Sequence, residues 1–217
     1  MIENFKSIIF DFDGTLHKTS KIYTPALAKG IKFLQDKGYL KDFELTDDYA
    51  SKFLGYSARD AWKLIVHGLP EDLIQSAMKI VGSAMDDNLK EGRGELYKNS
   101  QKTLEILRGR GKDLYLLSNA RVEYLDIATE VYDIKKYFKK IYAAESFDFI
   151  PKDQIIEKIQ KEMEKEIIVV GDRFHDIEGA EKNFLKSAFA LYGYGNEDEG
   201  KNADYKISDI SELLELF

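Results

Sequence analysis

Five short, largely apolar runs stand out along the chain, each four or five residues long. They lie at 7–10, 114–117, 141–144, 167–170 and 188–192. Strands that are buried on both faces of a parallel sheet have this pattern, whereas buried helices need longer runs. The pattern therefore predicts a parallel sheet, with 205–207 as a candidate sixth strand and a closing helix around Leu213.

Apolar residues at helical spacing separate the last four runs. Three groups each share one helical face: Val122, Leu125 and Ala128; Ile155, Ile156 and Ile159; and Ile177, Ala180 and Phe184. Strands that alternate with helices predict an α/β fold with right-handed crossovers. We therefore expect a Rossmann-like parallel sheet core that is flanked by helices.

Residues 16–91 interrupt this alternation, because they carry helix start signals and no convincing strand. The start signals are Thr24-Pro25, Thr46, Ser57 and Pro70. Threonine and serine are favoured as N-caps, and proline is favoured at the first helical position. Four helices are therefore predicted between the first and second strands.

The interruption ends at 91–94, where two glycines permit the unusual backbone angles of a hinge. Four helices within one insertion can bury their apolar faces against one another as a small bundle. We predict a core made of 1–15 and 92–217, with 16–91 inserted as a helical cap.

Composition limits the kinds of partner and site. The 217 residues carry a net charge of −7, which argues against nonspecific binding to nucleic acid or to anionic membranes. The chain has no cysteine, which excludes disulfides, thiolate metal sites and a cysteine nucleophile. The apolar start runs directly into Asp11 and does not predict a signal peptide, and no run approaches the ~18–20 residues of a membrane span. We expect a cytoplasmic monomer or homodimer.

Carboxylates follow the first predicted strand, where Asp11 and Asp13 are separated by one residue and followed by Gly14. Side chains two positions apart in extended chain point the same way, and the glycine permits a sharp turn. Ligands bind beyond the carboxyl ends of strands in open α/β sheets. An isolated pair of this kind is just as often a solvated turn.

Polar residues also follow the later strands. Ser118 and Asn119 end the second run, Lys152 precedes the fourth, and Asp172 and Asp176 follow the fourth. Each of these alone is better explained by helix capping or by a solvated charge. Their joint occurrence at the carboxyl ends of successive strands makes a shared site the better interpretation.

These motifs resemble those of the haloacid dehalogenase-like superfamily. The resemblance rests on DFDGTL at 11–16, LLSNA at 116–120, Lys152, VVGDRFHDIEGA at 169–180 and the segment 191–195. Within that superfamily the chain resembles the phosphoglycolate-phosphatase-like group, which carries a helical cap after the first strand. The resemblance covers nearly the whole chain.

The resemblance implies a Mg²⁺-dependent phosphatase that works through an aspartyl-phosphate. Asp11 would be the nucleophile and Asp13 the acid and base. Ser118 and Lys152 would bind the transferring phosphoryl group. The metal ligands would be Asp11, Asp172 and the backbone carbonyl of Asp13, supported by Asp176.

The cap implies a small phosphorylated substrate: a phosphoglycolate-like compound, a nucleotide or a sugar phosphate. The segment Gly55–Arg59 resembles the specificity loop of capped relatives, so Gly55, Tyr56 and Arg59 are expected to contact substrate together with Asn119. A sugar-phosphate mutase is the first alternative, and a non-catalytic binding module on the same fold is the second. Isomerised product, or a lost motif residue, would distinguish them.

Two further features are a departure from the family pattern at the cap hinge and three histidines without a predicted catalytic role. Lys18 stands where relatives usually carry an acid near the cap hinge. The resemblance therefore does not predict the hydrogen bonds of this hinge or the closure of the cap. His17, His67 and His175 form no pair with metal-ligand spacing, and we expect none of them to be catalytic.

Overall fold

The parallel sheet is the centre of the molecule. A computed structural model describes residues 5–216, so the first four residues of the predicted core and residue 217 lie outside it. The six strands are β1 (Ser7–Phe10), β2 (Asp113–Ser118), β3 (Phe138–Ala143), β4 (Ile167–Gly171), β5 (Lys186–Ala190) and β6 (Tyr205–Ile207). Their order across the sheet is β3-β2-β1-β4-β5-β6, and every pair is parallel. The predicted α/β fold is confirmed.

Strand boundaries differ from the apolar runs mainly at the edge of the sheet. β3 begins at Phe138, before the predicted 141, and includes the exposed Lys139 and Lys140. An edge strand is not covered on all sides, so it tolerates charged residues that an apolar-run criterion rejects. β5 ends at Ala190 rather than at 192.

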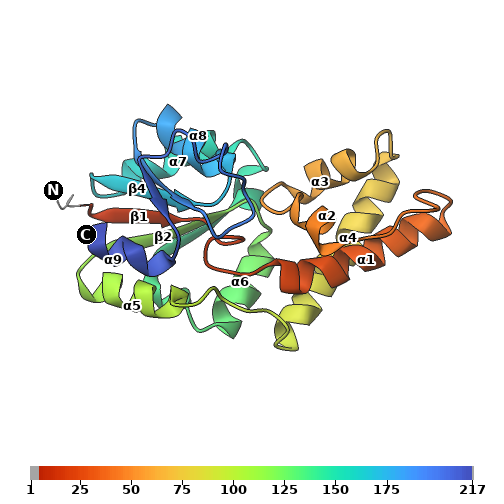
Figure 1. Ribbon diagram of the computed structural model, residues 1–217, viewed down its shortest axis with the longest axis horizontal. Coiled ribbons are helices and arrows are strands. Elements are labelled where there is room, and N and C mark those ends of the chain that lie inside the picture. Colours follow the sequence, from red (N-terminus) through yellow and green to blue (C-terminus); the bar gives the residue numbers. More distant parts are fainter. Residues whose placement is uncertain (1–4, 217) are drawn as a thin grey trace.

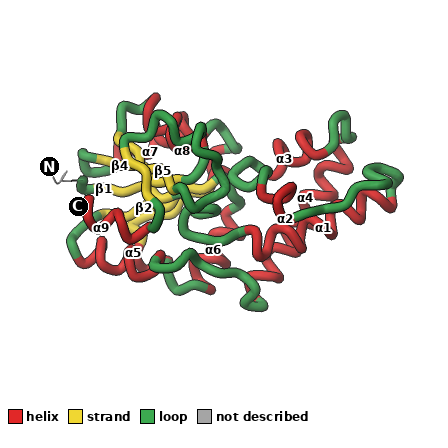
Figure 2. The backbone as a smooth tube through the Cα atoms, viewed as in Figure 1, coloured by secondary structure: helices red, strands yellow, loops and turns green. Residues whose placement is uncertain are grey.

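Helices form two groups. The core helices are α5 (Ser100–Gly109), α6 (Val122–Val131), α7 (Lys152–Ile159), α8 (Phe174–Lys182) and α9 (Leu213–Leu216). The cap helices are α1 (Ser20–Asp36), α2 (Asp47–Ser51), α3 (Ala58–Ile65) and α4 (Glu71–Lys90). Figure 1 shows the cap helices projecting as a lobe from the end of the sheet where the strands terminate. Figure 2 shows that this lobe contains helices and loops.

The sheet is covered on both faces, as the predicted strands require. Ile8 and Phe10 face a cluster that also holds Leu104 of α5 and Leu125 of α6. Ile9 faces the opposite way, into a cluster with the isoleucines of α7. Successive residues of one strand therefore supply two separate cores, which explains why the central strands are apolar throughout.

The predicted helix faces are buried as expected in the middle of each helix, but one residue at the start of α6 and one beyond the end of α8 are exposed. Phe184 is 98% exposed, because α8 ends at Lys182 and Phe184 lies in the following turn with a left-handed backbone. Val122 is 41% exposed, because it is the first residue of α6. Leu125 and Ala128 are fully buried, as expected.

The first cap helix begins earlier than predicted. α1 starts at Ser20, and the amides of Ile22 and Tyr23 bond to the carbonyl of Thr19. Pro25 therefore lies inside the helix rather than at its first position, where it removes one backbone hydrogen bond. The assignment of Thr24 as N-cap was wrong.

The other cap start signals are correct. The hydroxyls of Thr46 and Ser57 accept hydrogen bonds from Tyr49 and Asp60, and Pro70 immediately precedes α4. Cap helices pack around their own hydrophobic cluster, which includes Trp62. Such a cluster supports a separate cap, and the boundaries at 16 and 92 remain a prediction.

Two linkers join the cap to the core, and they pair with each other. The amide of Lys18 donates a hydrogen bond to the carbonyl of Glu95 at 2.8 Å, and the amide of Tyr97 donates one to the carbonyl of Leu16 at 2.9 Å. Lys18 also forms an ion pair with Glu95 at 2.8 Å. The lysine that departs from the family pattern thus bridges the hinge. Within residues 5–216, no helix is both long and apolar enough to span a membrane.

Candidate active site

Four charged residues from three strand ends meet beneath the cap. The Lys152 ammonium contacts Asp11 Oδ1 at 2.6 Å and Asp176 Oδ1 at 2.5 Å. Carboxylate oxygens of Asp11, Asp172 and Asp176 lie within 4.8 Å of one another. All four side chains are buried. The sheet therefore brings together the residues that the sequence places beyond β1, β3 and β4.

Charge in this cluster is unbalanced. Three carboxylates face one ammonium, which leaves two negative charges when all are ionised. Two like charges at about 4 Å repel by roughly 4 kcal/mol at an effective dielectric of 20. Burial, and then the neighbouring carboxylates, raise the pKa of Asp11 despite the opposing charge of Lys152.

The remaining pKa shifts have the same origin. Burial and the charge of Asp176 raise the pKa of Asp172 to about 7, although the Tyr194 amide favours its ionised form. Burial alone would lower the pKa of Lys152, but the charges of Asp11 and Asp176 outweigh it and raise that pKa. The ammonium therefore stays charged.

The donor set fits a divalent cation. Hard cations such as Mg²⁺ prefer carboxylate and carbonyl oxygens, and this cluster offers three buried carboxylates with two uncompensated negative charges. The site could thus hold a metal ion at Asp11, Asp172 and Asp176.

Asp172 is enclosed by backbone. Its Oδ2 accepts a hydrogen bond from the Tyr194 amide at 2.7 Å, and its Oδ1 accepts one from the Thr15 hydroxyl at 3.3 Å. A Cβ at Gly14 or Gly193 would collide with the Asp172 carboxylate, so only glycine lets these loops approach it. Gly14 also has a left-handed φ of 92°. The segment 191–195 therefore closes the site.

Asp13 does not join this cluster of charges. Its Oδ1 accepts hydrogen bonds from the hydroxyls of Thr19 at 2.6 Å and Tyr124 at 2.7 Å. The His17 ring lies 3.4 Å from the same oxygen. Asp11 and Asp13 both line the cavity beneath the cap, so the two carboxylates face one space in different electrostatic surroundings.

The end of β2 contributes one residue to the cavity and one to the cap. Ser118 is buried and lines the cavity floor together with Asp11. Asn119 lines it as well, and its amide donates a 2.9 Å hydrogen bond to the carbonyl of Gly55 in the cap. Asn119, which was predicted to contact substrate, therefore also ties the cap loop to the core.

The cap loop at 54–56 rests on the start of α8. The Arg173 guanidinium donates a hydrogen bond to the carbonyl of Leu54 and lies 5.1 Å from the centre of the Tyr56 ring. A Cβ at Gly55 would come within 2.8 Å of Arg173 Cγ, so the close contact requires glycine. Gly55 also has a φ of 89°. Gly55 and Tyr56 thus line the cavity, and their contact with substrate remains a prediction.

Arginines on the cavity wall are paired. Arg59 lines the cavity, but its guanidinium forms a 2.7 Å ion pair with Glu71, and both side chains are about half exposed. Arg121 also lines the cavity, and it contacts both oxygens of Asp86 in α4 at 3.0 Å. Glu71 therefore competes with any anionic ligand for the Arg59 guanidinium.

The cavity between cap and core has a volume of about 1040 Å³. That is near the upper end of the roughly 300–1,000 Å³ that small-molecule sites occupy. Its floor holds Asp11, Asp13 and Ser118, and its wall holds the cap loop. Space of this size admits a small molecule that extends from the carboxylates toward the cap.

Sequence reasoning missed several contributors. Arg173 lies within the motif at 169–180, but the sequence predicts no role for it. Its contact with the cap depends on Leu54, which is more than 100 positions away. Tyr124 looked like an ordinary buried residue of an apolar helix face. Thr19 lay close to Asp13 in the chain, which was the one available signal. His17 carries no metal-ligand spacing, and the sequence therefore predicts no role for it beside Asp13.

Comparison with known proteins agrees with the geometry. The family model described as haloacid dehalogenase-like hydrolase matches residues 8–190. A phosphoglycolate phosphatase of Aquifex aeolicus is 27% identical over 96% of this chain and 95% of its own. A 5'-nucleotidase of Pseudomonas aeruginosa is 24% identical over 90% of this chain and 86% of its own.

Solved structures show the same fold. A structure titled as a predicted phosphoglycolate phosphatase from Haemophilus somnus superposes with a TM-score of 0.81 at 24% identity and covers 98% of this chain and 97% of that one. A predicted phosphatase from Clostridium acetobutylicum gives a TM-score of 0.80 at 21% identity, with 97% of each chain covered. At these identities the likeness establishes the architecture.

Proposed function

Because the chain belongs to the haloacid dehalogenase-like hydrolase family, we propose that it is a Mg²⁺-dependent phosphatase of small phosphorylated metabolites, working through an aspartyl-phosphate at Asp11. The observation that carries the proposal is the environment of Asp11, which lies on the cavity floor against Lys152, Asp172 and Asp176. Hydrolysis of phosphate esters is the activity that this arrangement supports best.

Asp11 is suited to attack phosphorus because it is held in place. Lys152 fixes its Oδ1, and the strand end points it into the cavity. A carboxylate that approaches a phosphoryl dianion is repelled, and the Lys152 charge offsets part of that repulsion. When bound, Mg²⁺ would neutralise further charge at Asp11, Asp172 and Asp176, with the Asp13 carbonyl as an additional ligand. Asp176 supports the arrangement by bonding Lys152 and the Arg173 amide.

Asp13 is suited to move the proton. In the first step the Asp11 oxygen bonds to phosphorus, the bond to the leaving oxygen breaks, and that oxygen takes a proton from Asp13. In the second step Asp13 removes a proton from the water that cleaves the aspartyl-phosphate. Ser118, on the same cavity floor, can hydrogen-bond the transferring group.

Substrate selection belongs to the cavity wall. Gly55, Tyr56, Arg59 and Asn119 contact the space that the leaving group would occupy. The relatives are named for phosphoglycolate and for nucleotides, which have different leaving groups. We therefore propose small phosphate monoesters as the substrate class and name no single substrate.

The test is release of inorganic phosphate from a panel of phosphorylated metabolites and from phenyl phosphates, with Mg²⁺ and with a chelator. Phosphate release that requires the metal is expected. Isomerised product without phosphate release would identify a mutase instead. Absence of turnover for every substrate, phenyl phosphates included, would favour a non-catalytic binding module.

A further inference from the structure

Asp13 is anchored through a single oxygen. Its Oδ1 accepts the hydroxyl protons of Thr19 at 2.6 Å and of Tyr124 at 2.7 Å. No residue within 5–216 donates a hydrogen bond to its Oδ2, and Asp13 lines the cavity. One oxygen is therefore held by protein donors, and the other is left for the reaction.

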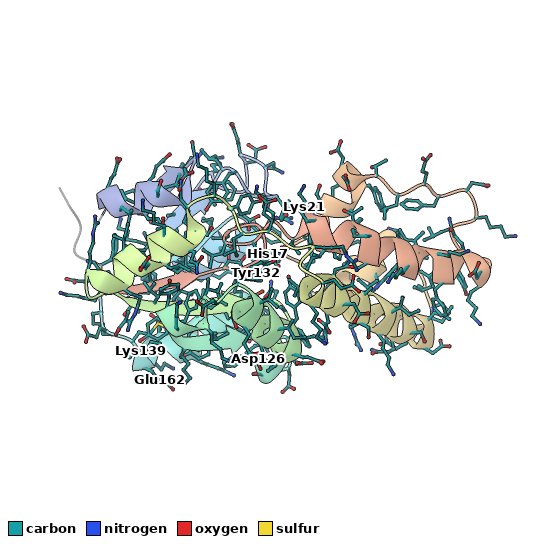
Figure 3. All side chains as sticks on the ribbon, turned by 90° about the horizontal axis from the view of Figure 1, so that it is seen from below. His17, Lys21, Asp126, Tyr132, Lys139 and Glu162 are labelled. Atoms are coloured by element: carbon teal, nitrogen blue, oxygen red, sulfur yellow. The ribbon has the colours of Figure 1, made fainter. Side chains whose placement is uncertain are left out.

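Behind Thr19 lies a chain of hydrogen bonds that ends at Tyr132. His17 Nδ1 is 3.1 Å from the Thr19 hydroxyl oxygen, and His17 Nε2 is 3.0 Å from the Tyr132 hydroxyl. Figure 3 shows His17 and Tyr132 side by side where the cap joins the core. The Thr19 proton points to Asp13, so the Thr19 oxygen can accept a hydrogen bond from Nδ1, and the Tyr132 hydroxyl lies within hydrogen-bond distance of Nε2.

His17, Thr19 and Tyr124 are packed in place, and Tyr132 is partly buried. His17 is fully buried, Thr19 is 1% exposed and Tyr124 is 3% exposed. The His17 ring stacks on Phe12 with 5.0 Å between ring centres and 16° between planes. Burial and the adjacent Asp13 carboxylate raise the pKa of Tyr124, so its hydroxyl keeps the proton that it donates.

The network also lies at the hinge. The segment around His17 pairs with Leu96 of the returning linker, and Thr19 immediately precedes α1 of the cap. A Cβ at Gly94 of the same linker would collide with the Tyr132 hydroxyl. Both linkers therefore close around the residues that hold Asp13.

We propose that Tyr124 and Thr19 are positioning residues that fix Asp13 by Oδ1 and direct Oδ2 to the leaving oxygen, with His17 and Tyr132 orienting Thr19. The inference rests on the proposed function, in which Asp13 moves the proton. Because Oδ1 is occupied by donors, the proton of the acid form sits on Oδ2. It passes from there to the leaving oxygen, and Oδ2 later takes a proton from the attacking water.

The test compares two substrates of nearly equal size that differ in their need for the proton. Phenolate is a poor leaving group that needs protonation, whereas para-nitrophenolate leaves as a stable anion. The value of kcat/KM reports the steps up to formation of the phosphoenzyme, so it isolates the first proton transfer. Tyr124→Phe should lower kcat/KM for phenyl phosphate by about tenfold and that for para-nitrophenyl phosphate by less than about threefold.

Tyr49→Phe is the matched control, because Tyr49 lies in α2 among cap aromatic residues and should leave both values unchanged. The ratio of the two values on one preparation cancels any loss of folded protein. An unchanged ratio in Tyr124→Phe would overturn the proposal. Failure of the wild-type chain on both phenyl phosphates would instead count against the proposed function.

Two variants of His17 test the chain behind Thr19. The amide nitrogen of asparagine can occupy the Nδ1 position, whereas that of glutamine reaches the Nε2 position. His17→Asn should therefore keep the substrate ratio within about twofold of wild type, and His17→Gln should shift it in the direction of Tyr124→Phe. Wild-type ratios in both variants would remove His17 and Tyr132 from the proposal.

Discussion

Charged groups of the core site and those of the cap wall differ in burial and in the partners that hold them. Lys152 and Asp11 have side chains only 3% and 8% exposed, and each fixes the other. Arg59 and Glu71 are 50% and 55% exposed, in an ion pair within the cap. Removing one partner of a buried pair leaves an uncompensated charge, whereas an exposed pair contributes about 0–1 kcal/mol.

This contrast suggests a division of roles, in which core residues transfer the phosphoryl group and cap residues select the leaving group. The core holds its groups in one geometry, and substitutions there should affect every substrate. The cap wall holds its charged groups weakly, so substitutions of those groups should have smaller effects that depend on the leaving group. The following predictions test that division, beginning with the largest expected effect.

Asp11→Asn should abolish turnover of every substrate, by roughly a thousandfold or more, because an amide cannot form the phosphoenzyme. Folding should survive, since Lys152 keeps its ion pair with Asp176 and the change relieves repulsion among the buried carboxylates. Steady-state phosphate release and thermal melting check both points. Asp148→Asn is the control, because Asp148 is an exposed residue of the same cavity. Retention of more than a few per cent of kcat, without deamidation, would contradict a nucleophilic Asp11.

Removing the metal should stop turnover. Excess EDTA should abolish phosphate release, and Mg²⁺ should restore it, because the carboxylate cluster offers hard oxygen ligands. Zn²⁺ should restore it poorly, since the chain has no cysteine and the cluster no histidine. Full activity in EDTA would be incompatible with a metal-dependent reaction.

Stability of the metal-free protein should depend on pH through Asp172. Its folded pKa of about 7 lies above the unfolded value of about 3.9, so the folded state binds more protons between those values. The free energy of unfolding should therefore decrease as pH rises from about 4 to 7. Melting temperatures in EDTA at pH 5.5 and pH 8 measure the decrease.

Two comparisons sharpen this pH prediction. Mg²⁺ should raise the melting temperature more at pH 8 than at pH 5.5, because protons compete with the metal for Asp172. Asp172→Asn should reduce the pH dependence in EDTA, and the raised pKa of Asp11 should account for a remainder of the same sign. A slope that Asp172→Asn leaves unchanged would assign the effect to other groups.

Gly55→Ala should weaken catalysis through the cap loop. The new Cβ would press on Arg173 Cγ, so the loop should lose its contact with the core and kcat/KM should fall by about tenfold for all substrates. Gly68→Ala is the matched control, because Gly68 also has a left-handed backbone but open space at its Cβ. Both variants should lower the melting temperature, and only Gly55→Ala should lower activity. Equal activities would show that loop docking is dispensable.

Arg59→Ala should have the smallest effect. If Arg59 leaves Glu71 to contact an anionic leaving group, the net loss is about 1 kcal/mol, or roughly fivefold in kcat/KM. A phenyl phosphate should be hydrolysed as before. Lys63→Ala, one turn further along α3 and off the cavity wall, should change neither value. Equal losses on both substrates would place selection elsewhere on the cap.

Local sequence was sufficient for most of the elements and for the grouping of the charged core residues. Apolar runs indicate buried strands because a strand covered on both faces favours apolar side chains. The runs missed the start of the edge strand β3 and extended beyond the end of β5. Asp11, Lys152, Asp172 and Asp176 could be placed together because parallel strands bring their carboxyl ends to one edge. Local sequence also identified the N-caps Thr46 and Ser57, because a cap needs only the next turn of its own helix.

Tertiary structure decided what depends on distant partners. Tyr124 is an ordinary aromatic of a helix face until the fold brings its hydroxyl to Asp13, 111 positions away. The sequence predicts that Arg59 contacts substrate, and only the packing of α3 against α4 shows it paired with Glu71. Hydrogen bonds and ion pairs act over a few ångströms in space, so a pattern read along the chain cannot register them when their partners are far apart in sequence.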